Sequence, residues 1–251
     1  MRLDGVEVKV NVDADQTQAA LQMLDLLPVD PWQIFFIEDV TAGLSSSTPL
    51  LDEHLIIRAR QKTQGADDVT VKFRPARRSQ LGSRWLGMKK TKDGDLRSEL
   101  KVEEDWASGR RSLGISLTAE RPDGLVAAAA DQGGVAALLT HDQRELIDQC
   151  AGARVNLDVL SPLPAVSAMR WPAFTVPRPG GEDLKVRAER WTIHSLDFLE
   201  LSIAVAVDEA QACQSALEDF VAGKGLQVSA AEAKTSQVMQ LLVATAANPP
   251  A

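Results

Sequence analysis

Apolar and polar residues alternate with a period of two in five segments of this chain. The first runs from Val6 to Val12, where valines alternate with polar residues that include Glu7 and Lys9. This pattern is typical of a β-strand with one apolar and one polar face, and here the polar face is charged. The other four segments are Leu55–Arg60, Val69–Arg74, Leu100–Asp105 and Leu196–Val207. Residues 61–68 read QKTQGADD and predict a hairpin turn between the second and third segments.

Apolar residues at helical spacing occur between and after these segments. Helices are expected over Asp15–Leu27, from Thr140 toward Cys150, from Asp208 to Gly223, and over Lys234–Ala244. Thr140 and Gln143 form the sequence pattern of a capping box, which marks the start of a helix. The order of elements predicts an antiparallel α+β fold rather than a repeating βαβ fold. We expect one domain over residues 1–251, with a helical insertion around residues 122–152.

The composition is that of a globular protein. The 251 residues are 45% apolar and 25% charged, which excludes disorder as the main state. No apolar stretch approaches the roughly 20 residues of a membrane-spanning helix, and Asp4 and Glu7 stand where a signal peptide would be apolar. Cys150 and Cys213 lack metal-type spacing and are expected to be buried helix residues. A cytoplasmic protein without a thiolate zinc site is therefore expected.

Charge is distributed unevenly along the chain. The net charge is −8, but residues 56–111 contain fifteen basic and eight acidic residues, a balance of +7, while the remainder carries −15. A basic block can be a solvated face, a nucleic-acid patch or a pocket for a small polyanion. A nucleic-acid surface needs stacking rings, and Trp85 and Trp106 are the candidates in a chain that is only 4% aromatic and has no tyrosine. Composition therefore favours the solvated face or the pocket.

The polar faces of the predicted strands differ in the sign of their charge. Basic side chains recur on two of the predicted strands, at Arg58, Arg60, Lys72 and Arg74. Acidic side chains recur on two others, at Glu103, Asp105 and Glu200. Cations of this kind bind a polyphosphate, and carboxylates bind the divalent metal that accompanies it. If the sheet closes on itself, the charged faces line a polar lumen, an arrangement that barrels permit.

Six short motifs follow one another along the chain. They are VEVKV at residues 6–10, LIIRAR at 55–60, VTVKFRP at 69–75, LKVEED at 100–105, FLELSI at 198–203 and KTSQVMQLL at 234–242. In this order they resemble the CYTH superfamily, the triphosphate tunnel metalloenzymes that include class IV adenylyl cyclases, thiamine triphosphatases and tripolyphosphatases. The phrases LTHDQRELID, VLSPLPAV and AERW in the middle of the chain are similar to uncharacterised bacterial CYTH-like proteins. The resemblance covers nearly the whole length.

The resemblance implies an antiparallel eight-stranded β-tunnel with flanking helices, whose basic interior grips a triphosphate while carboxylates hold Mg²⁺ or Mn²⁺. Carried over to this sequence, it assigns phosphate oxygens to Lys9, Arg58, Arg60, Lys72 and Arg74 and, less directly, to Arg170 and Lys185. It assigns the metal to Glu7, Glu103, Asp105 and Glu200. It gives catalytic roles to Glu7, Lys9 and Glu103.

The activity that the resemblance implies is metal-dependent hydrolysis of inorganic tripolyphosphate or of an organic or nucleoside triphosphate. The partner is then a small molecule rather than a nucleic acid or a membrane. The chain departs from the pattern at Gly5 and Ser202, where glutamates are usual, and at Ala204, where CYTH-like relatives have lysine. A triphosphatase, a binding protein that no longer turns over and a class IV-type adenylyl cyclase all stay open. The sequence does not determine the triphosphate, the metal preference or the oligomeric state.

Overall fold

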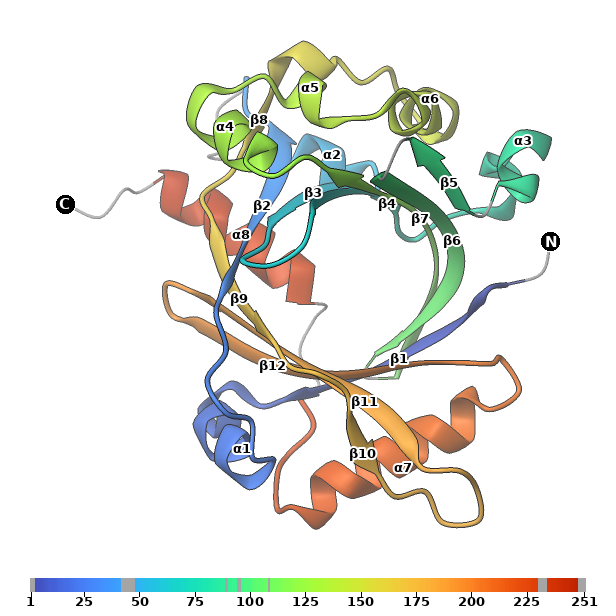
Figure 1. The fold of residues 1–251 in the computed structure, drawn as a ribbon, viewed down its shortest axis with the longest axis vertical. Coiled ribbons are helices and arrows are strands. Elements are labelled where there is room, and N and C mark those ends of the chain that lie inside the picture. The colour runs from blue at the N-terminus through green and yellow to red at the C-terminus, as the bar shows by residue number, and fades with distance from the viewer. Residues whose placement is uncertain are drawn as a thin grey trace.

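In a computed structural model the chain forms a closed β-barrel (Figure 1). The structure describes residues 3–41, 48–88, 90–93, 96–107, 109–229 and 234–247. Around the ring, neighbouring strands are β1 (Gly5–Val12), β12 (Leu196–Val205), β11 (Leu184–Ile193), β9 (Val166–Arg170), β2 (Trp32–Asp39), β3 (Leu55–Gln61), β4 (Asp67–Phe73), β7 (Arg110–Arg121) and β6 (Leu96–Ala107). β6 pairs with β1 and closes the ring. Three short strands extend the sheet: β5 (Lys90–Asp93) beside β6, β8 (Leu160–Pro162) beside β2, and β10 (Phe174–Val176) beside β11.

The α+β class is confirmed, but the expectation of eight antiparallel strands is wrong. Nine of the described strands form the ring, and β1 runs parallel to β6, with Glu7 opposite Asp105. The remaining junctions of the ring are antiparallel. Strand direction cannot alternate all the way around a ring with an odd number of members. At least one junction must therefore be parallel.

Helices cover the outside of the barrel on two opposite sides (Figure 1). On one side, α4 (Leu125–Gln132), α5 (Val135–Leu138) and α6 (His141–Cys150) pack on apolar side chains of β3, β4 and β7. On the other side, α1 (Thr17–Met23) and α7 (Ala210–Gly223) pack on β1, β11 and β12. Because alternate residues of a strand point to opposite faces, burial of the apolar set under these helices directs the charged set into the lumen.

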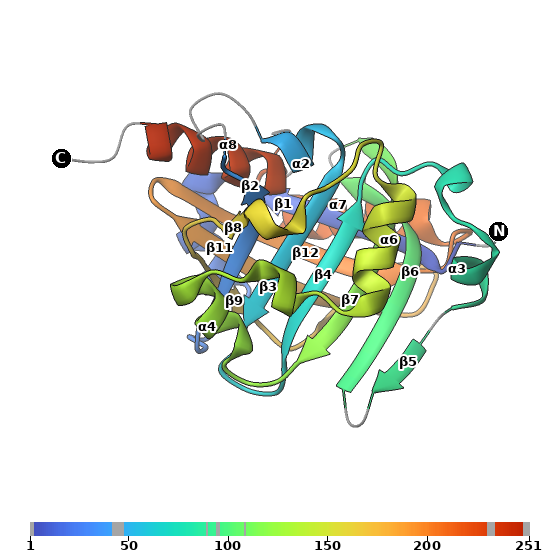
Figure 2. The same ribbon diagram turned by 90° about the horizontal axis from the view of Figure 1, so that it is seen from above.

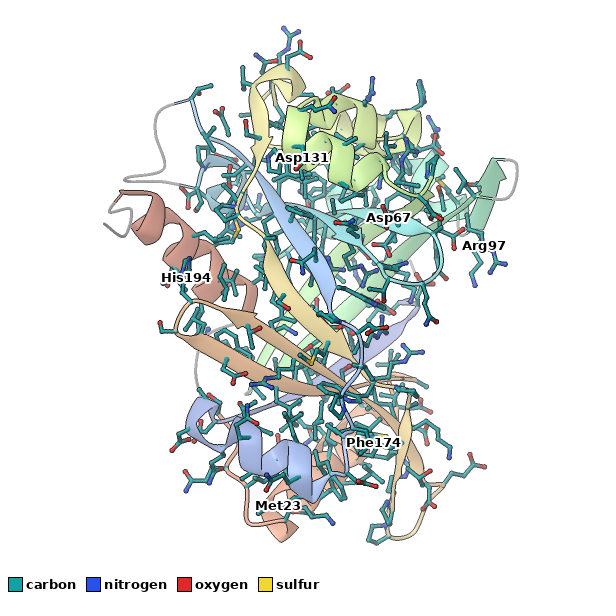
Figure 3. The ribbon with its side chains drawn as sticks, turned by 60° about the vertical axis from the view of Figure 1, so that its left-hand side comes forward. Met23, Asp67, Arg97, Asp131, Phe174 and His194 are labelled. Carbon is teal, nitrogen blue, oxygen red and sulfur yellow. The ribbon has the colours of Figure 1, made fainter. Side chains whose placement is uncertain are left out.

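The two ends of the barrel differ. α8 (Lys234–Ala247) lies across one end (Figure 2), which is also the end of the β11–β12 turn at His194, whereas Arg97 of β6 lies at the other end (Figure 3). Apolar residues of α8, among them Val238 and Met239, belong to a cluster that includes Phe36 of β2 and Trp191 of β11. Phe36 and Trp191 also line the lumen. The helix therefore covers that end of the lumen.

The remaining helical segments lie in the connections. They are α2 (Pro49–Asp52), α3 (Ser83–Gly87) and three turns of 3-10 helix at Ala14–Gln16, Arg78–Gln80 and Leu157–Val159. The helix expected over residues 15–27 is shorter than the pattern suggests: α1 ends at Met23, and Asp25 adopts a left-handed conformation with φ of 51°. No described helix is both long enough and apolar enough to cross a bilayer.

Gln143 joins the helical insertion to the barrel. It is fully buried and completes with Thr140 the capping box expected from the sequence. Its amide Nε2 also donates hydrogen bonds to the carbonyl oxygens of Val69 on β4 and Leu117 on β7, at 2.8 and 3.0 Å. A residue that the sequence marks as a helix cap thus also anchors α6 on two adjacent strands.

Substitution of Gln143 should reveal this anchor in the stability of the whole chain. Gln143→Leu should lower the free energy of unfolding by about 1–3 kcal/mol, because it removes two buried hydrogen bonds and half of a capping box. Asp148→Ala, at an exposed position on the same helix, is the control and should be nearly neutral. Urea denaturation measures both variants. A loss no larger than that of the control would show that the amide does not anchor the helix.

Candidate functional site

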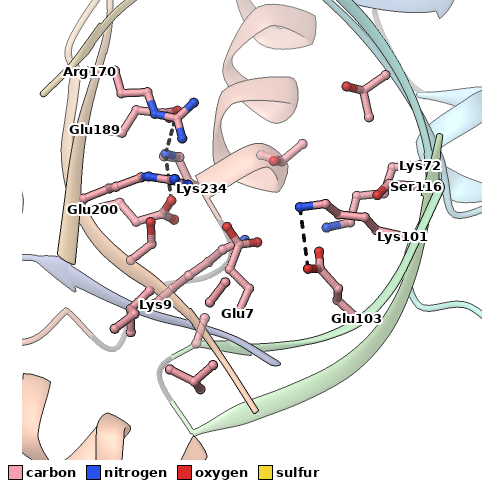
Figure 4. A pocket seen from close by; sticks show the side chains of 18 of the residues that line it. Glu7, Lys9, Lys72, Lys101, Glu103, Ser116, Arg170, Glu189, Glu200 and Lys234 are labelled. Carbon is pink, nitrogen blue, oxygen red and sulfur yellow. Dashed lines mark hydrogen bonds and ion pairs between the residues drawn. The ribbon is translucent and has the colours of Figure 1, made fainter. Parts of the chain in front are cut away.

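The barrel encloses a cavity of about 780 Å³. Side chains from most strands of the ring converge on it (Figure 4). The described lining contains eleven lysine and arginine and eight aspartate and glutamate side chains. The lumen is thus basic in a chain whose net charge is −8, and it concentrates cations where an anion can be surrounded.

All of the site residues expected from the sequence except Asp105 line this cavity. They are Glu7, Lys9, Arg58, Arg60, Lys72, Arg74, Glu103, Arg170, Lys185 and Glu200. They converge because strand alternation directs their apolar neighbours outward: Val6 and Val8 flank Glu7 and are fully buried beside α7. The shared lumen inferred from the sequence is therefore present in the structure.

Asp105 lies in the wall of the barrel and is surrounded by cations. Its two carboxylate oxygens are 2.7 Å from the Nζ atoms of Lys9 and Lys72, and Oδ2 is 3.6 Å from Nη1 of Arg74. Burial by itself would raise the pKa of Asp105, but these three positive charges hold it well below its usual range. Asp105 therefore positions cations, and both of its oxygens are occupied by them rather than free for a metal.

Gly114 on β7 makes room for this ion pair. A Cβ atom at this position would lie 3.1 Å from Cε of Lys72 and 3.2 Å from Oδ2 of Asp105. Both distances are shorter than ordinary van der Waals contact, so a side chain there would push the lysine and the aspartate apart. The glycine thus lets a lysine on β4 reach a carboxylate on β6 past the strand that lies between them.

Arg58 is a deeply placed cation of the lumen that lacks a counterion. Among the described residues no carboxylate oxygen lies within 4 Å of its guanidinium, and its buried Nε has no hydrogen-bond partner. Desolvation, with the nearby charge of Arg60 adding to it, lowers the pKa of Arg58 to about 10. An enclosed cation without a partner is costly, and a bound anion would remove that cost.

Arg60 and Arg170 stand nearer the end of the barrel away from α8. Arg60 donates two hydrogen bonds to Asp68, with Nε and Nη2 at 2.7 and 2.8 Å from its oxygens. Desolvation lowers the pKa of Arg170, which has no carboxylate oxygen within 4 Å in the described part of the chain. Arg60 is thus fixed by a wall carboxylate, whereas Arg170 is available to an anion.

Several lining residues were not assigned from the sequence. Lys234, the first residue of α8, places its Nζ 3.2 Å from Glu200 and 3.6 Å from Glu189, and 4.0 Å from the ring centre of Trp191 (Figure 4). Arg187 and Glu189 could have been found, because on β11 they alternate with apolar Val186 and Ala188. Lys234 begins the KTSQVMQLL motif, so the resemblance marked its segment, but periodicity alone does not indicate that the first residue of a helix enters a barrel.

Glu189 is the carboxylate of this second cluster. Burial by itself would raise its pKa, but the charges of Lys234 and Arg58 lower it to about 2. It also accepts a hydrogen bond from the indole Nε1 of Trp191. Glu189 therefore stays ionised and balances part of the charge of Arg58 from a distance.

The positions at which the sequence departs from the pattern that it resembles lie together on β1 and β12. Gly5 is next to Val205, and Ala204 pairs with Glu7 across β1 and β12. A Cβ atom at Gly5 would lie 2.9 Å from the carbonyl oxygen of Val205, so the backbone itself occupies the space of the expected glutamate. Measured against the pattern that the sequence resembles, one side of the lumen thus lacks two carboxylates, at Gly5 and Ser202, and one cation, at Ala204.

The carboxylates of the lumen can hold a divalent cation only together with another ligand. Glu7, Glu103 and Glu200 offer the oxygen donors that Mg²⁺ and Mn²⁺ prefer. Glu7 is 2.7 Å from Lys9, whereas the nearest cation to Glu103 is Lys101 at 3.8 Å, and desolvation raises the pKa of Glu103. Among the described residues no three lumen carboxylates bring their oxygens within 4.8 Å of one another. This donor set fits an ion that is shared with the oxygens of a bound phosphate, as Mg²⁺ often is.

Comparison with known proteins supports the fold. No family model matches the chain, and no curated protein matches it in sequence. Among solved structures it is similar to HpAC1 from Hippeastrum, a proposed adenylyl cyclase that is reported to have a dominant triphosphatase activity. The TM-score is 0.60 at 14% identity, over 94% of this chain and 95% of that one. A proposed adenylate cyclase from Bacillus halodurans aligns with a TM-score of 0.54 at 11% identity, over 94% and 97% of the chains. The general fold implied by the sequence resemblance, a closed β-barrel with flanking helices, is thus confirmed, although the ring of this chain has nine strands and one parallel junction.

The ion pairs of Glu189 predict a stability that depends on pH. Its pKa is lowered from about 4.5 to about 2 in the folded chain, so the stabilisation is complete above about pH 4.5 and is lost as the pH falls toward 2. Glu189→Gln should therefore destabilise the chain at pH 7, and the difference from the unsubstituted chain should shrink below about pH 4.5.

Urea unfolding at pH 7, 5 and 3.5 measures this difference. Glu182→Gln, which removes an exposed carboxylate at the edge of the same cavity, serves as the control and should show little effect at any of the three values. A Glu189→Gln deficit that stays constant down to pH 3.5 would mean that Glu189 contributes through packing rather than through charge.

Proposed function

We propose that the lumen binds the triphosphate group of a small molecule and that the chain hydrolyses it with the help of Mg²⁺ or Mn²⁺. The observation that carries the proposal is Arg58, an enclosed cation with no counterion inside a basic cavity. A protein that needed only a stable barrel would pair such a group or replace it with an apolar residue. The triphosphatase activity reported for the Hippeastrum neighbour supports the same ligand class.

The arrangement of cations favours a chain of phosphates over a single one. Arg58, Lys72 and Lys9 reach the lumen from β3, β4 and β1, so they surround a ligand from different sides. Arg170 adds a further cation toward the end away from α8. Charge-assisted hydrogen bonds from arginine and lysine are the usual means of holding phosphate oxygens.

In the proposed reaction, a water attacks a phosphorus of the bound chain and a phosphate leaves. Lys9 and Lys72, which Asp105 keeps in place, would neutralise charge on the transferred group. Glu103 would accept the proton of the water, because desolvation raises its pKa and no cation lies within 3.5 Å of it in the described part of the chain. Glu7 and Glu103, together with the bound phosphate, would hold a divalent ion, which would supply further charge neutralisation. Hydrolysis needs only water, whereas cyclisation needs a nucleoside held in a defined pose.

A second candidate is a binding protein without turnover. It is favoured by Gly5 and Ala204, which leave part of the lumen without the polar groups expected there. Such a protein would keep the cations that hold an anion and lack part of the machinery that reacts with it. The two candidates agree on the ligand and differ in the release of phosphate.

Binding can be tested without any metal. Arg58→Ala should weaken the affinity for inorganic tripolyphosphate by about 1.5–3 kcal/mol, at least about tenfold in Kd, because it removes a charge-assisted contact and no existing ion pair. Arg154→Ala, which removes an exposed arginine outside the lumen, is the matched control and should bind as the unsubstituted chain does. Calorimetric titration in the presence of a chelator measures all three. Equal affinities for Arg58→Ala and the control would contradict the proposed site.

Turnover is tested by phosphate release. With Mg²⁺ or Mn²⁺ the chain should release phosphate from a panel of tripolyphosphate, thiamine triphosphate and nucleoside triphosphates, and Glu103→Gln should abolish that release. In chelator, Glu103→Gln should bind tripolyphosphate as well as the unsubstituted chain or better, since it removes a negative charge from the lumen.

The outcomes separate the candidates. Tight binding of tripolyphosphate without release from any member of the panel would favour the binding protein. Cyclic AMP as the main product from ATP would overturn hydrolysis as the activity. A loss of metal-free binding in Glu103→Gln as large as that in Arg58→Ala would mean that Glu103 supports the cations rather than the reaction.

A further inference from the structure

Trp32 is a half-buried aromatic residue at the start of β2. Strand alternation places it on the same face as Phe36, which lines the cavity. β2 pairs antiparallel with β3, and Gln33 lies opposite Gln61, the last residue of β3. Trp32 therefore stands nearer the end of the barrel away from α8, and Phe36 lies deeper; both contact the apolar cluster that α8 joins.

Three cations surround the ring of Trp32. The guanidinium carbons of Arg60 and Arg170 and the Nζ atom of Lys62 lie 5.7, 5.8 and 5.8 Å from its centre. These distances are within the range of cation–π attraction. Arg60 and Arg170 also line the cavity. The indole thus lies directly beside the cations at this end of the lumen.

The position of Trp32 relative to the proposed phosphate site is fixed by the register of β2 and β3. Arg58 lies opposite Phe36 and Arg60 lies opposite Ile34, so Trp32 comes one step further toward the end of the barrel. A triphosphate held by Arg58 and Lys72 would lie along the axis of the lumen, with one terminal phosphate toward each end of the barrel. The end on the side of Phe36 is covered by α8. Because α8 covers one end, an organic group attached to the phosphates would extend toward the other end, where Arg60 and Trp32 lie.

We propose that Trp32 is a specificity-determining residue that stacks against a neutral aromatic ring attached to the triphosphate, so that the substrates are nucleoside triphosphates. This inference rests on the proposed function of the lumen. The indole is only half-buried, so part of its surface is open to a flat nucleobase, and stacking of this kind tolerates every base. The three surrounding cations repel a positively charged ring, so they disfavour the thiazolium of thiamine triphosphate.

Two ligands that share the triphosphate and differ in the ring test the inference. Titration calorimetry in chelator compares ATP with inorganic tripolyphosphate for the unsubstituted chain, Trp32→Leu, Trp32→Phe and Phe35→Leu. Trp32→Leu should weaken ATP binding about tenfold and leave tripolyphosphate binding unchanged. Trp32→Phe, which keeps an aromatic face, should retain most of the affinity for ATP. Phe35→Leu is the control, because it shortens an aromatic residue on the opposite face of the same strand.

Each other outcome overturns the inference in a different way. An equal loss for both ligands in Trp32→Leu would mean that the indole only positions Arg60 and Arg170. Unchanged binding of both ligands would mean that the ring of ATP does not reach Trp32. Thiamine triphosphate binding as tight as that of ATP would contradict the selection of a neutral ring. Failure of the unsubstituted chain to bind tripolyphosphate would overturn the proposed function, and this inference with it.

Discussion

The charges inside the barrel depend on one buried carboxylate. Three like charges meet in a confined space, those of Lys9 on β1, Lys72 on β4 and Arg74 directly after β4, and Asp105 binds all three from the wall of the barrel. It thereby fixes the ends of long, flexible side chains that would otherwise lose substantial conformational entropy on binding a ligand. Arg58 lies outside this network. The lumen therefore combines cations that are already held by a carboxylate with others, such as Arg58, that have no ion pair until a ligand binds.

The odd number of strands in the ring contributes to this arrangement. Its single parallel junction sets β1 beside β6 so that Glu7 is opposite Asp105 and Lys9 is opposite Ala107. Gly114 on the neighbouring β7 leaves space for Lys72. Two lysines from different strands, Lys9 and Lys72, thus reach the same carboxylate.

The sequence predicts those parts of the structure in which burial on one face imposes a period of two. The strands of Lys9, Arg58 and Lys72 were found in this way, and so was their common lumen. β2 was missed because WQIFFIED is apolar on both faces: Phe35 and Ile37 pack under the outer helices, while Ile34 and Phe36 pack in the cluster of α8. The role of Asp105 was also beyond prediction, since periodicity places a residue on a face but does not determine which atoms from other strands will reach it.

The close approach of Gly5 to the carbonyl oxygen of Val205 affects how a binding protein of this fold could be converted into a triphosphatase. A lost ligand is usually restored by a single substitution, because the vacated space stays open. Here the carbonyl oxygen of Val205 stands 2.9 Å from where the new Cβ would be, so a glutamate at position 5 needs β12 to move relative to β1. That movement would also shift Ser202 and Glu200, which lie on the same strand. Introducing the missing carboxylate at position 5 therefore requires a change in the packing of β1 against β12 as well as the substitution itself.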